Sequence, residues 1–453
     1  MGETARLAEF VADFTADDVP DEVVVHARRA IRDYLGVAIY GSAHGVGRRI
    51  RSYVDASMPG SAATMLGDGT ASVPGAALAN GTFGHAVDYD DTFESIVIHP
   101  TSPVFPAALA PAESADATGN DVLAGYVVGV ETAYRVGHAT YPAHYDNGWH
   151  STGTIGAFGA AAAAASVLDL DADAVRRAFG IVASGSSSLK KNFGTMTKPL
   201  HAGHAASAGV RAAMLADEGF TADRDVLDGE MGYGAVMTPG GSYDPDVVTD
   251  GLGAEWGTLD VGFKPYPSGV ITHAAMDALR DLVVENDLTP ETVERVTVSL
   301  DDAASEMLIH ADPSDELEAK FSIEFCLAAV LRERDPGVHE FTDEYVRAAA
   351  TREAMALVER DFEEDLFGGG FAGYGARGVV ETAAGETLVA EEKHAPGGPT
   401  NPVSEDRLLG KFRACAETVL PTEEVDDVLA GLDALDADDA DGLDLLLAGA
   451  RTA

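Results

Sequence analysis

The sequence is poor in basic residues. Lys and Arg together number 30 against 75 Asp and Glu in 453 residues, which gives a formal net charge of −45. Nucleic-acid binding needs a basic surface, so this balance argues against it. The acidic residues run through the whole chain rather than forming a tail. Such a charge is typical of a folded protein from a halophile, because ~1 M salt shortens the Debye length to ~3 Å.

Cysteine and long apolar runs are also scarce. Cys326 and Cys415 lie far apart and outside any C-x-x-C motif. This argues against a disulfide framework and against a cysteine-ligated iron–sulfur cluster, which needs about four thiolates. The longest run of small apolar residues, "GAFGAAAAAASVL", is shorter than the ~20 residues of a membrane span. The first residues, "MGETARLAEFVADF", lack the regions of a signal peptide. We expect a soluble, cytoplasmic protein with no membrane partner.

Lysine is almost absent, and a lysine kept in so acidic a sequence is more often required. The lysines are Lys190, Lys191, Lys198, Lys264, Lys320, Lys393 and Lys411. A buried stem or a salt bridge would also retain one, so each has to be judged by its neighbours.

The pattern of apolar and polar residues along the chain changes twice. Residues from about 3 to 260 are mainly helical in pattern, as in "DEVVVHARRAIRDYLGVAIYG", which has apolar residues at helical spacing. Near Lys264 the pattern changes: "VERVTVSLDD" alternates like a strand, and "GARGVVETAAGETLVAEE" predicts two strands joined at "AAGE". From "NPVSEDRLLGKFRACAETVL" helix returns. We predict a mainly α fold, with a large all-α domain (1–263 and 401–453) and a smaller α+β domain (264–400).

One stretch, "GHAVDYDDTFESIVIHP", gathers acidic residues and histidines. If "NGTFGHAVDYDDT" is a helix, then His85, Asp88 and Thr92 share one face. His99 precedes a proline, which favours an extended backbone. A carboxylate, a hydroxyl and an imidazole could then converge on a pocket and transfer a proton.

The aspartates of this stretch also have a simpler interpretation as surface charge of a very acidic protein. That alternative is stronger for Asp90 and Asp91 than for Asp88. A metal site is not indicated, because Phe93 stands where an EF-hand loop requires glycine and no H-E-x-x-H occurs. We therefore predict no metal.

Two further stretches place cationic or donor groups ahead of helices. "GWHSTGTIG" puts His150 before Ser151 and Thr152, either of which could cap the Ala-rich helix that follows. "GTMTKPLHAGHAASAG" puts Lys198 before a proline and a helix that opens with small residues. Small residues at a helix N-terminus leave backbone N–H groups free to bind an anion.

"FKPYPSGVITHAAMDA" repeats the pattern, with Lys264 in a proline-rich loop and His273 ahead of a helix. A lone histidine or lysine of this kind is usually structural. Together these groups give a cation-poor chain several donors on rigid loops, which indicates a site for a di- or tricarboxylate.

Several blocks, in order, resemble the MmgE/PrpD family of cofactor-independent 2-methylcitrate dehydratases, with cis-aconitate decarboxylase and iminodisuccinate epimerase as relatives. The blocks are "NGTFGHAVDYDDT", "HPTSPVFPAALA", "GVETAYRVG", "GWHSTGTIGAFGAAAAAA", "GTMTKPLHAGHAASAGVRAAMLADEGFTA", "FKPYPSGVITHAAMDA" and "EAKFSIEF". The resemblance implies a homodimer without a cofactor. It also implies a large all-α domain built from both ends of the chain, an inserted α+β lid, and an active site between these domains.

The resemblance also implies which residues form the site. The family's functional positions correspond to Asp88, Thr92, His99, His150, Lys198 and Lys264. Three departures bear on the substrate: Phe325 stands where relatives often have tyrosine, Ser268 where many have Cys or Ala, and the loop from Thr92 to His99 is one residue longer than in the decarboxylase.

These observations predict a lyase that dehydrates 2-methylcitrate or citrate. His99 is the predicted proton-transferring group, with Asp88 orienting it or shifting its pKa. His150, also counted among the catalytic residues, is predicted to help the lysines hold substrate carboxylates and stabilise the charge that develops. Lys198, Lys264, Thr92 and His273 are the predicted substrate-binding residues. Decarboxylation of cis-aconitate, or epimerisation of an amino- or iminodicarboxylate, would use the same groups. An alternative of another class is a carboxylate-binding protein without catalytic activity.

Overall fold

Two compact units make up the fold of the computed structural model. The first unit is Met1–Gly262 with Cys415–Ala453, and the second is Phe263–Ala414. The structure describes residues 2–93, 95–115, 117–368, 374–436 and 441–450. The fold is mainly α with a small mixed sheet, which confirms the predicted fold class. The chain returns to the first unit within helix α18 (Glu405–Ala416), later than the predicted position 401.

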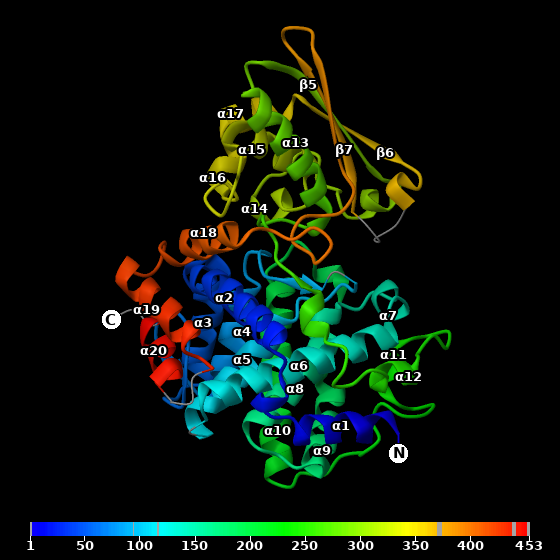
Figure 1. Cartoon of the computed structure of the whole chain (residues 1–453), viewed down its shortest axis with the longest axis vertical. Helices are drawn as coiled ribbons and strands as arrows, with labels where there is room; N and C mark the ends of the chain where they lie inside the picture. Colours follow the sequence, from blue (N-terminus) through cyan, green and yellow to red (C-terminus); the bar gives the residue numbers. More distant parts are fainter. Residues whose placement is uncertain (1, 94, 116, 369–373, 437–440, 451–453) are drawn as a thin grey trace. The chain divides into compact units, whose positions relative to one another are not determined.

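The first unit is a bundle of helices around α8, whose residues Ser151–Val167 are almost all buried (Figure 1). Its alanines and glycines let α5, α6, α9 and α10 pack closely around it. The helices of this unit are α1 (Glu3–Asp13), α2 (Asp21–Ala43), α3 (Gly45–Ser57), α4 (Val73–Gly84), α5 (Thr101–Ala115), α6 (Gly119–Thr140), α7 (Ala143–Asp146), α8, α9 (Ala172–Gly185), α10 (Thr197–Asp217), α11 (Tyr233–Met237), α12 (Pro245–Thr249), α19 (Thr422–Asp433) and α20 (Asp441–Gly449).

Two short antiparallel strand pairs accompany these helices. β1 (Ala63–Thr64) pairs with β2 (Thr70–Ala71), and β3 (Thr92–Phe93) pairs with β4 (Val261–Gly262). The β3–β4 pair fixes the chain between α4 and α5 to a segment far away in the sequence.

Helices α4 and α10 cross at glycines. A Cβ on Gly203 would lie 2.2 Å from the carbonyl oxygen of Leu78, and a Cβ on Gly81 would lie 2.8 Å from Cα of Gly203. No side chain fits at such distances, so both positions require glycine. The close crossing brings the first turn of α10, which carries Lys198, beside the end of α4.

The second unit is built on a four-stranded sheet with the order β6-β5-β7-β8. β5 and β6 are parallel and the other pairs are antiparallel. The β7–β8 pair joined at "AAGE" confirms the predicted hairpin. Helix α13 contacts β7 and β8, and α15 contacts β6 (Figure 1). The elements are α13 (His273–Asn286), β5 (Val293–Asp301), α14 (Glu316–Ala319), α15 (Ile323–Glu333), α16 (Asp343–Arg347), α17 (Ala349–Met355), β6 (Val358–Glu363), β7 (Ala376–Thr382), β8 (Thr387–Glu392) and α18.

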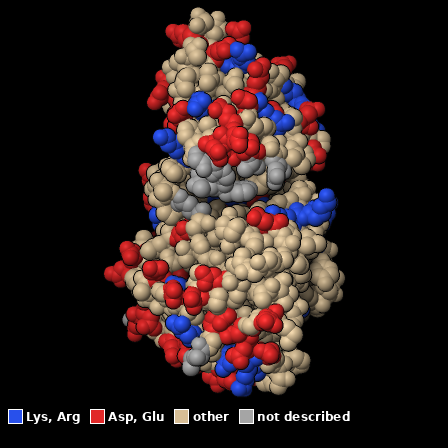
Figure 2. Space-filling model, turned by 90° about the vertical axis from the view of Figure 1, so that its right-hand side faces the viewer, with Lys and Arg blue, Asp and Glu red and all other residues tan. Residues whose placement is uncertain are grey.

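Acidic side chains occur over much of the face shown in Figure 2. On the face shown in Figure 2, Asp and Glu occur in many separate groups and Lys and Arg in fewer. None of the described helices combines the length and the apolar character that a membrane crossing needs.

Candidate active site

The loop that follows α4 forms the centre of the candidate site. The helix ends at Gly84, so the condition that "NGTFGHAVDYDDT" is helical throughout is not met. Residues 85–91 form turns instead, and Asp88 has a left-handed backbone with φ of 57°. Aspartate side chains compete with the helix for hydrogen bonds and favour such turns. His85, Asp88 and Thr92 therefore do not share a helix face, although the loop still brings polar atoms of His85 and Asp88 within 4.8 Å of one another.

Asp90 and Asp91 are buried, with 0% exposure each, so the surface-charge interpretation is wrong for both. The carboxylate of Asp90 lies 2.9 Å from Nδ1 of His85 and accepts a hydrogen bond of 2.7 Å from the hydroxyl of Ser102. Asp91 accepts hydrogen bonds from the hydroxyl and the backbone N–H of Thr101. Burial raises the pKa of Asp91 well above its ordinary value, and the neighbouring Asp90 adds to the rise.

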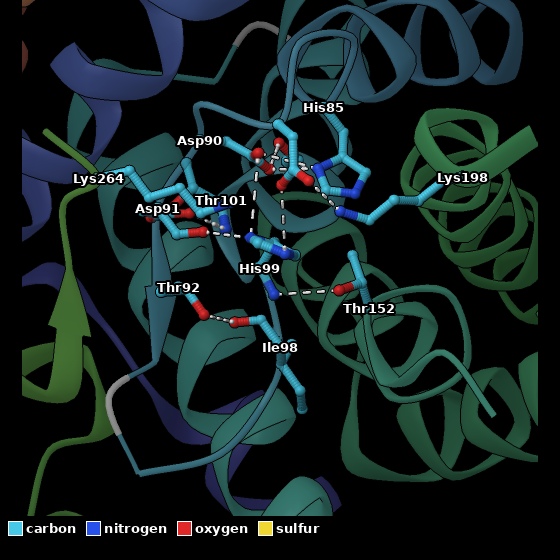
Figure 3. Close-up of polar contacts among 12 residues, drawn as sticks. His85, Asp90, Asp91, Thr92, Ile98, His99, Thr101, Thr152, Lys198 and Lys264 are labelled. Atoms are coloured by element: carbon cyan, nitrogen blue, oxygen red, sulfur yellow. Dashed lines mark hydrogen bonds and ion pairs between the residues drawn. The ribbon is translucent and has the colours of Figure 1, made fainter. Parts of the chain in front are cut away.

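Asp88, Lys198 and His99 form a buried polar cluster. Figure 3 shows the side chains of His85, His99 and Lys198 directed toward one another. Nζ of Lys198 lies 2.6 Å from Oδ2 of Asp88, and both side chains are below 10% exposure. Nε2 of His99 lies 4.0 Å from the other carboxylate oxygen, Oδ1. The three predicted residues thus meet, with the carboxylate of Asp88 between the ammonium and the imidazole.

The hydrogen bonds of His99 define its tautomer. Nδ1 lies 2.7 Å from the carbonyl oxygen of Asp91. A carbonyl only accepts, so Nδ1 carries the hydrogen and Nε2 is the atom that faces Asp88. The backbone N–H of His99 donates to the hydroxyl of Thr152 at 3.1 Å. One hydrogen bond thus fixes the ring of His99 and another fixes its backbone, with Nε2 on the side of Asp88.

Two more histidines join this group from the starts of α8 and α10. Nδ1 of His150 lies 2.9 Å from Nδ1 of His201. Burial, together with the nearby charges of His85 and Lys198, lowers the pKa of His150 well below its ordinary value. Burial also lowers the pKa of His201 to about 4. Both rings are therefore neutral at physiological pH and can act as hydrogen-bonding groups, not as cations.

Helix starts differ from the predicted ones at two of these positions. α8 begins at Ser151 with His150 as its N-cap residue, and the cap makes no side-chain hydrogen bond. The predicted caps Ser151 and Thr152 lie inside the helix, where Thr152 binds the backbone of His99 instead. α10 begins at Thr197, so Lys198 lies in its first turn and not ahead of the helix.

Thr92 is the first residue of β3, the strand that follows the loop. Its hydroxyl donates to the carbonyl oxygens of Phe93 and Ile98, each at 3.2 Å. These bonds close the loop that leads to His99. The structure gives Thr92 a local role in holding that loop, and its contact with a substrate stays a prediction.

Lys264 and His273 belong to the second unit, where both are buried. The carbonyl oxygen of Lys264 accepts a hydrogen bond of 3.0 Å from Nζ of Lys411. His273 is the first residue of α13, and its Nε2 lies 3.2 Å from the carbonyl oxygen of Ser268. The substrate-binding roles of Lys264 and His273 stay predictions.

Several residues of the site were missed or undervalued in the sequence. The sequence pattern puts His85 near Asp88 but indicates no role for it, and no pattern distinguishes His201. Phe193 packs edge-on against His150 with a ring separation of 4.9 Å, and Nζ of Lys198 lies 5.2 Å from its ring centre. Only its proximity in sequence to Lys198 could have indicated this position.

The arrangement suits acid–base chemistry on an anionic substrate. An imidazole with a defined tautomer, a carboxylate and an ammonium lie in a buried pocket, where electrostatic interactions are stronger than in water. The neutral ring of His150 adds a donor or acceptor beside them.

Comparison with known proteins identifies the family. Residues 5–246 match the MmgE/PrpD N-terminal domain, and residues 266–435 match the MmgE/PrpD C-terminal domain. The human cis-aconitate decarboxylase is 29% identical over 98% of this chain and 94% of its own length. The mouse enzyme of that name is 27% identical over 98% and 93%, and that of Aspergillus terreus 27% over 96% and 94%. The chain belongs to the MmgE/PrpD family.

Proposed function

We propose that the chain is a lyase that acts on a small di- or tricarboxylate by proton transfer, and that decarboxylation of cis-aconitate is its first candidate reaction. The observation that carries the proposal is the buried group of His99, Asp88 and Lys198, in which an imidazole Nε2 faces an ion pair. Relatives named cis-aconitate decarboxylase cover nearly the whole chain, which favours this reaction over the predicted dehydration.

Decarboxylation requires one proton per turnover. The proton adds to the vinylic carbon of cis-aconitate, and the C–C bond to the carboxylate on the methylene group breaks. The electron pair of that bond forms the new terminal double bond, which gives itaconate and CO2. The protonated Nε2 of His99 is the proposed donor, since its Nδ1 is bound to the carbonyl of Asp91. General acid catalysis of this kind contributes roughly 10²–10⁴-fold.

The neighbours of His99 have supporting roles in this proposal. Asp88, 4.0 Å from Nε2, stabilises the imidazolium form before the proton leaves. Lys198 neutralises Asp88 and provides positive charge for a substrate carboxylate. His150, neutral through burial, offers its ring as a hydrogen-bonding group without adding charge.

Dehydration of 2-methylcitrate or citrate is the second candidate. From the resemblance we expect the loop from Thr92 to His99 to be one residue longer than in the decarboxylase, and such a difference would favour a substrate of different shape. In this reaction the imidazole accepts a C–H proton next to a carboxylate, and the departing hydroxyl takes up a proton. Epimerisation of an iminodicarboxylate would need the same groups.

Proton NMR of the full chain with cis-aconitate, 2-methylcitrate and citrate in separate tubes tests the proposal. Itaconate from cis-aconitate supports decarboxylation, and a new vinylic signal from 2-methylcitrate or citrate supports dehydration instead. The samples contain ~1 M KCl to screen the acidic surface. Binding of the carboxylates without turnover in any tube would contradict both reactions and support a non-catalytic binding protein.

The expected assembly and location belong to the same proposal. We infer a homodimer that acts in the cytoplasm on a small carboxylate. Sedimentation velocity in ~1 M KCl measures the assembly, and a monomer with full turnover would contradict it.

A further inference from the structure

Three buried histidines of the first unit have the spacing of a metal site. His85, His99 and His150 each offer one ring nitrogen, and these atoms lie within 4.8 Å of one another. A second grouping with the same spacing combines His85 and His99 with the carboxylates of Asp88 and Asp90. Three imidazoles with a fourth position left open are a common ligand set for Zn²⁺.

The outer nitrogens of two rings are bound as they are in zinc sites. Nδ1 of His85 lies 2.9 Å from the carboxylate of Asp90, and Nδ1 of His99 lies 2.7 Å from the carbonyl oxygen of Asp91. Metal-binding histidines almost always donate their other ring N–H to a carboxylate or a carbonyl, which orients the ring and leaves the lone pair on the inner nitrogen. His85 and His99 are set in that way before any metal binds.

The buried Nε2 atom of His85 gives the strongest support for a metal site. The side chain is 0% exposed, and among the described residues no hydrogen-bond partner reaches Nε2. An unsatisfied buried polar atom is costly, and native structures rarely contain one without a reason. The proposed proton transfer uses His99 and gives this nitrogen no part. A metal ion would satisfy it.

His150 and the surrounding charges also favour a bound metal ion. Nδ1 of His150 faces Nδ1 of His201, so His150 can donate to that ring and keep its own Nε2 for a ligand. The carboxylates of Asp88 and Asp90 lie beside the rings, and Asp88 also pairs with the ammonium of Lys198. Because two carboxylates and only one ammonium lie here, the local charge favours a cation in this position.

We propose that His85, His99 and His150 bind a divalent transition metal of the Zn²⁺ type, and that the bound ion inhibits the enzyme by occupying Nε2 of His99. Imidazole nitrogen selects metals such as zinc, cobalt, nickel and copper over magnesium and calcium. The ion is an inhibitor and not a cofactor. The inhibition rests on the proposed function, whereas metal binding does not.

Cobalt titration of the full chain tests the site directly. Co²⁺ replaces Zn²⁺ in tetrahedral sites and gives strong visible absorption bands there. We expect one Co²⁺ per chain with such bands in ~1 M KCl, unaffected by excess Mg²⁺ and removed by Zn²⁺. Failure to bind, or bands of an octahedral ion that Mg²⁺ displaces, would overturn the proposal and indicate binding to surface carboxylates.

Variants separate the site from the remaining histidines. His85→Asn and His150→Asn are each expected to abolish the bands, while His339→Asn, which removes an exposed histidine of the second unit, keeps them. Asp90→Asn keeps all three rings but weakens the acceptor of His85, so Co²⁺ affinity should fall about 10–100-fold. Tryptophan fluorescence in urea checks that each variant folds. Unchanged Co²⁺ bands in folded His85→Asn protein would overturn the proposal.

Inhibition is measured separately from binding. Free Zn²⁺ is set with a nitrilotriacetate buffer, because carboxylate substrates themselves chelate the ion. We expect turnover to fall in proportion to metal occupancy and to return with EDTA. Metal binding without any lyase activity would contradict the proposed function but keep the site, whereas full activity at full Zn²⁺ occupancy would refute the inhibitory role.

Discussion

Asp88→Asn tests the buried ion pair at the centre of the candidate site. Asp88 and Lys198 have side chains 8% and 9% exposed, with 2.6 Å between Oδ2 and Nζ. Asp88 has φ of 57°, a conformation that asparagine adopts as readily as aspartate. Removal of one partner from a buried pair costs about 3–5 kcal/mol. Because the amide oxygen still accepts a hydrogen bond from Nζ, we expect a loss near the lower limit, about 3 kcal/mol.

The two tryptophans give a suitable assay. Trp149 and Trp256 both belong to the first unit, so their fluorescence in urea follows the unfolding of that unit. Asp169→Asn is the matched control, because Asp169 also has a left-handed backbone, with φ of 53°, but is exposed. We expect the control to change the free energy of unfolding by less than about 0.5 kcal/mol.

A double-mutant cycle separates the ion pair from other effects. Lys198→Met removes the ammonium, and the double variant with Asp88→Asn leaves neither charge buried. If the pair is coupled, the double variant loses less stability than the sum of the single variants, by about 1–3 kcal/mol. Additive losses, or an Asp88→Asn variant as stable as Asp169→Asn, would refute the reasoning.

Three further predictions concern turnover, packing and pH. His99→Asn should lower turnover by roughly 10²–10⁴-fold in the NMR assay. Its urea midpoint should change by no more than that of the Asp169→Asn control. Near-normal turnover would show that His99 has no part in the mechanism. Gly203→Ala should lower the free energy of unfolding by at least about 1–3 kcal/mol, because its Cβ would lie 2.2 Å from the carbonyl oxygen of Leu78; an unchanged urea midpoint would contradict the close crossing. Burial lowers the pKa of His144 to about 4 from the usual 6.5. The unfolded chain therefore binds more protons between about pH 4 and 6.5, and the stability of the folded protein falls as the pH drops through this range. In His144→Gln the urea midpoint should depend less on pH over the same range.

Much of the fold could be predicted because its patterns are local. The alternation in "VERVTVSLDD" became β5, and the turn at "AAGE" joins β7 and β8 as expected. These patterns depend on residues a few positions apart, so the sequence contains them in full. The end of α4 was not predicted, since the helix pattern continues past Gly84 and only the turns and β3–β4 pairing beyond it show where the helix stops.

The candidate site was predicted in part for a similar reason. Lys198 could be identified because lysine is rare in this chain, so its retention carried information. Asp90 and Asp91 could not be identified, because aspartate is abundant and the sequence does not distinguish a buried aspartate from one on the surface. Their partners Ser102 and Thr101 lie at the start of α5, and no spacing rule connects those positions to a loop before them.

The partners of the three aspartates explain how one short loop supports chemistry. Asp88 pairs with the ammonium of Lys198 in α10, Asp90 faces an imidazole N–H of His85, and Asp91 accepts from Thr101 in α5. Burial raises the pKa of Asp91, so this carboxyl differs in proton affinity from an ordinary aspartate although it has the same side chain. Helices α5 and α10 therefore determine what each carboxyl can do. A change that shifts the start of either helix should alter proton transfer at His99 without touching a residue of the loop.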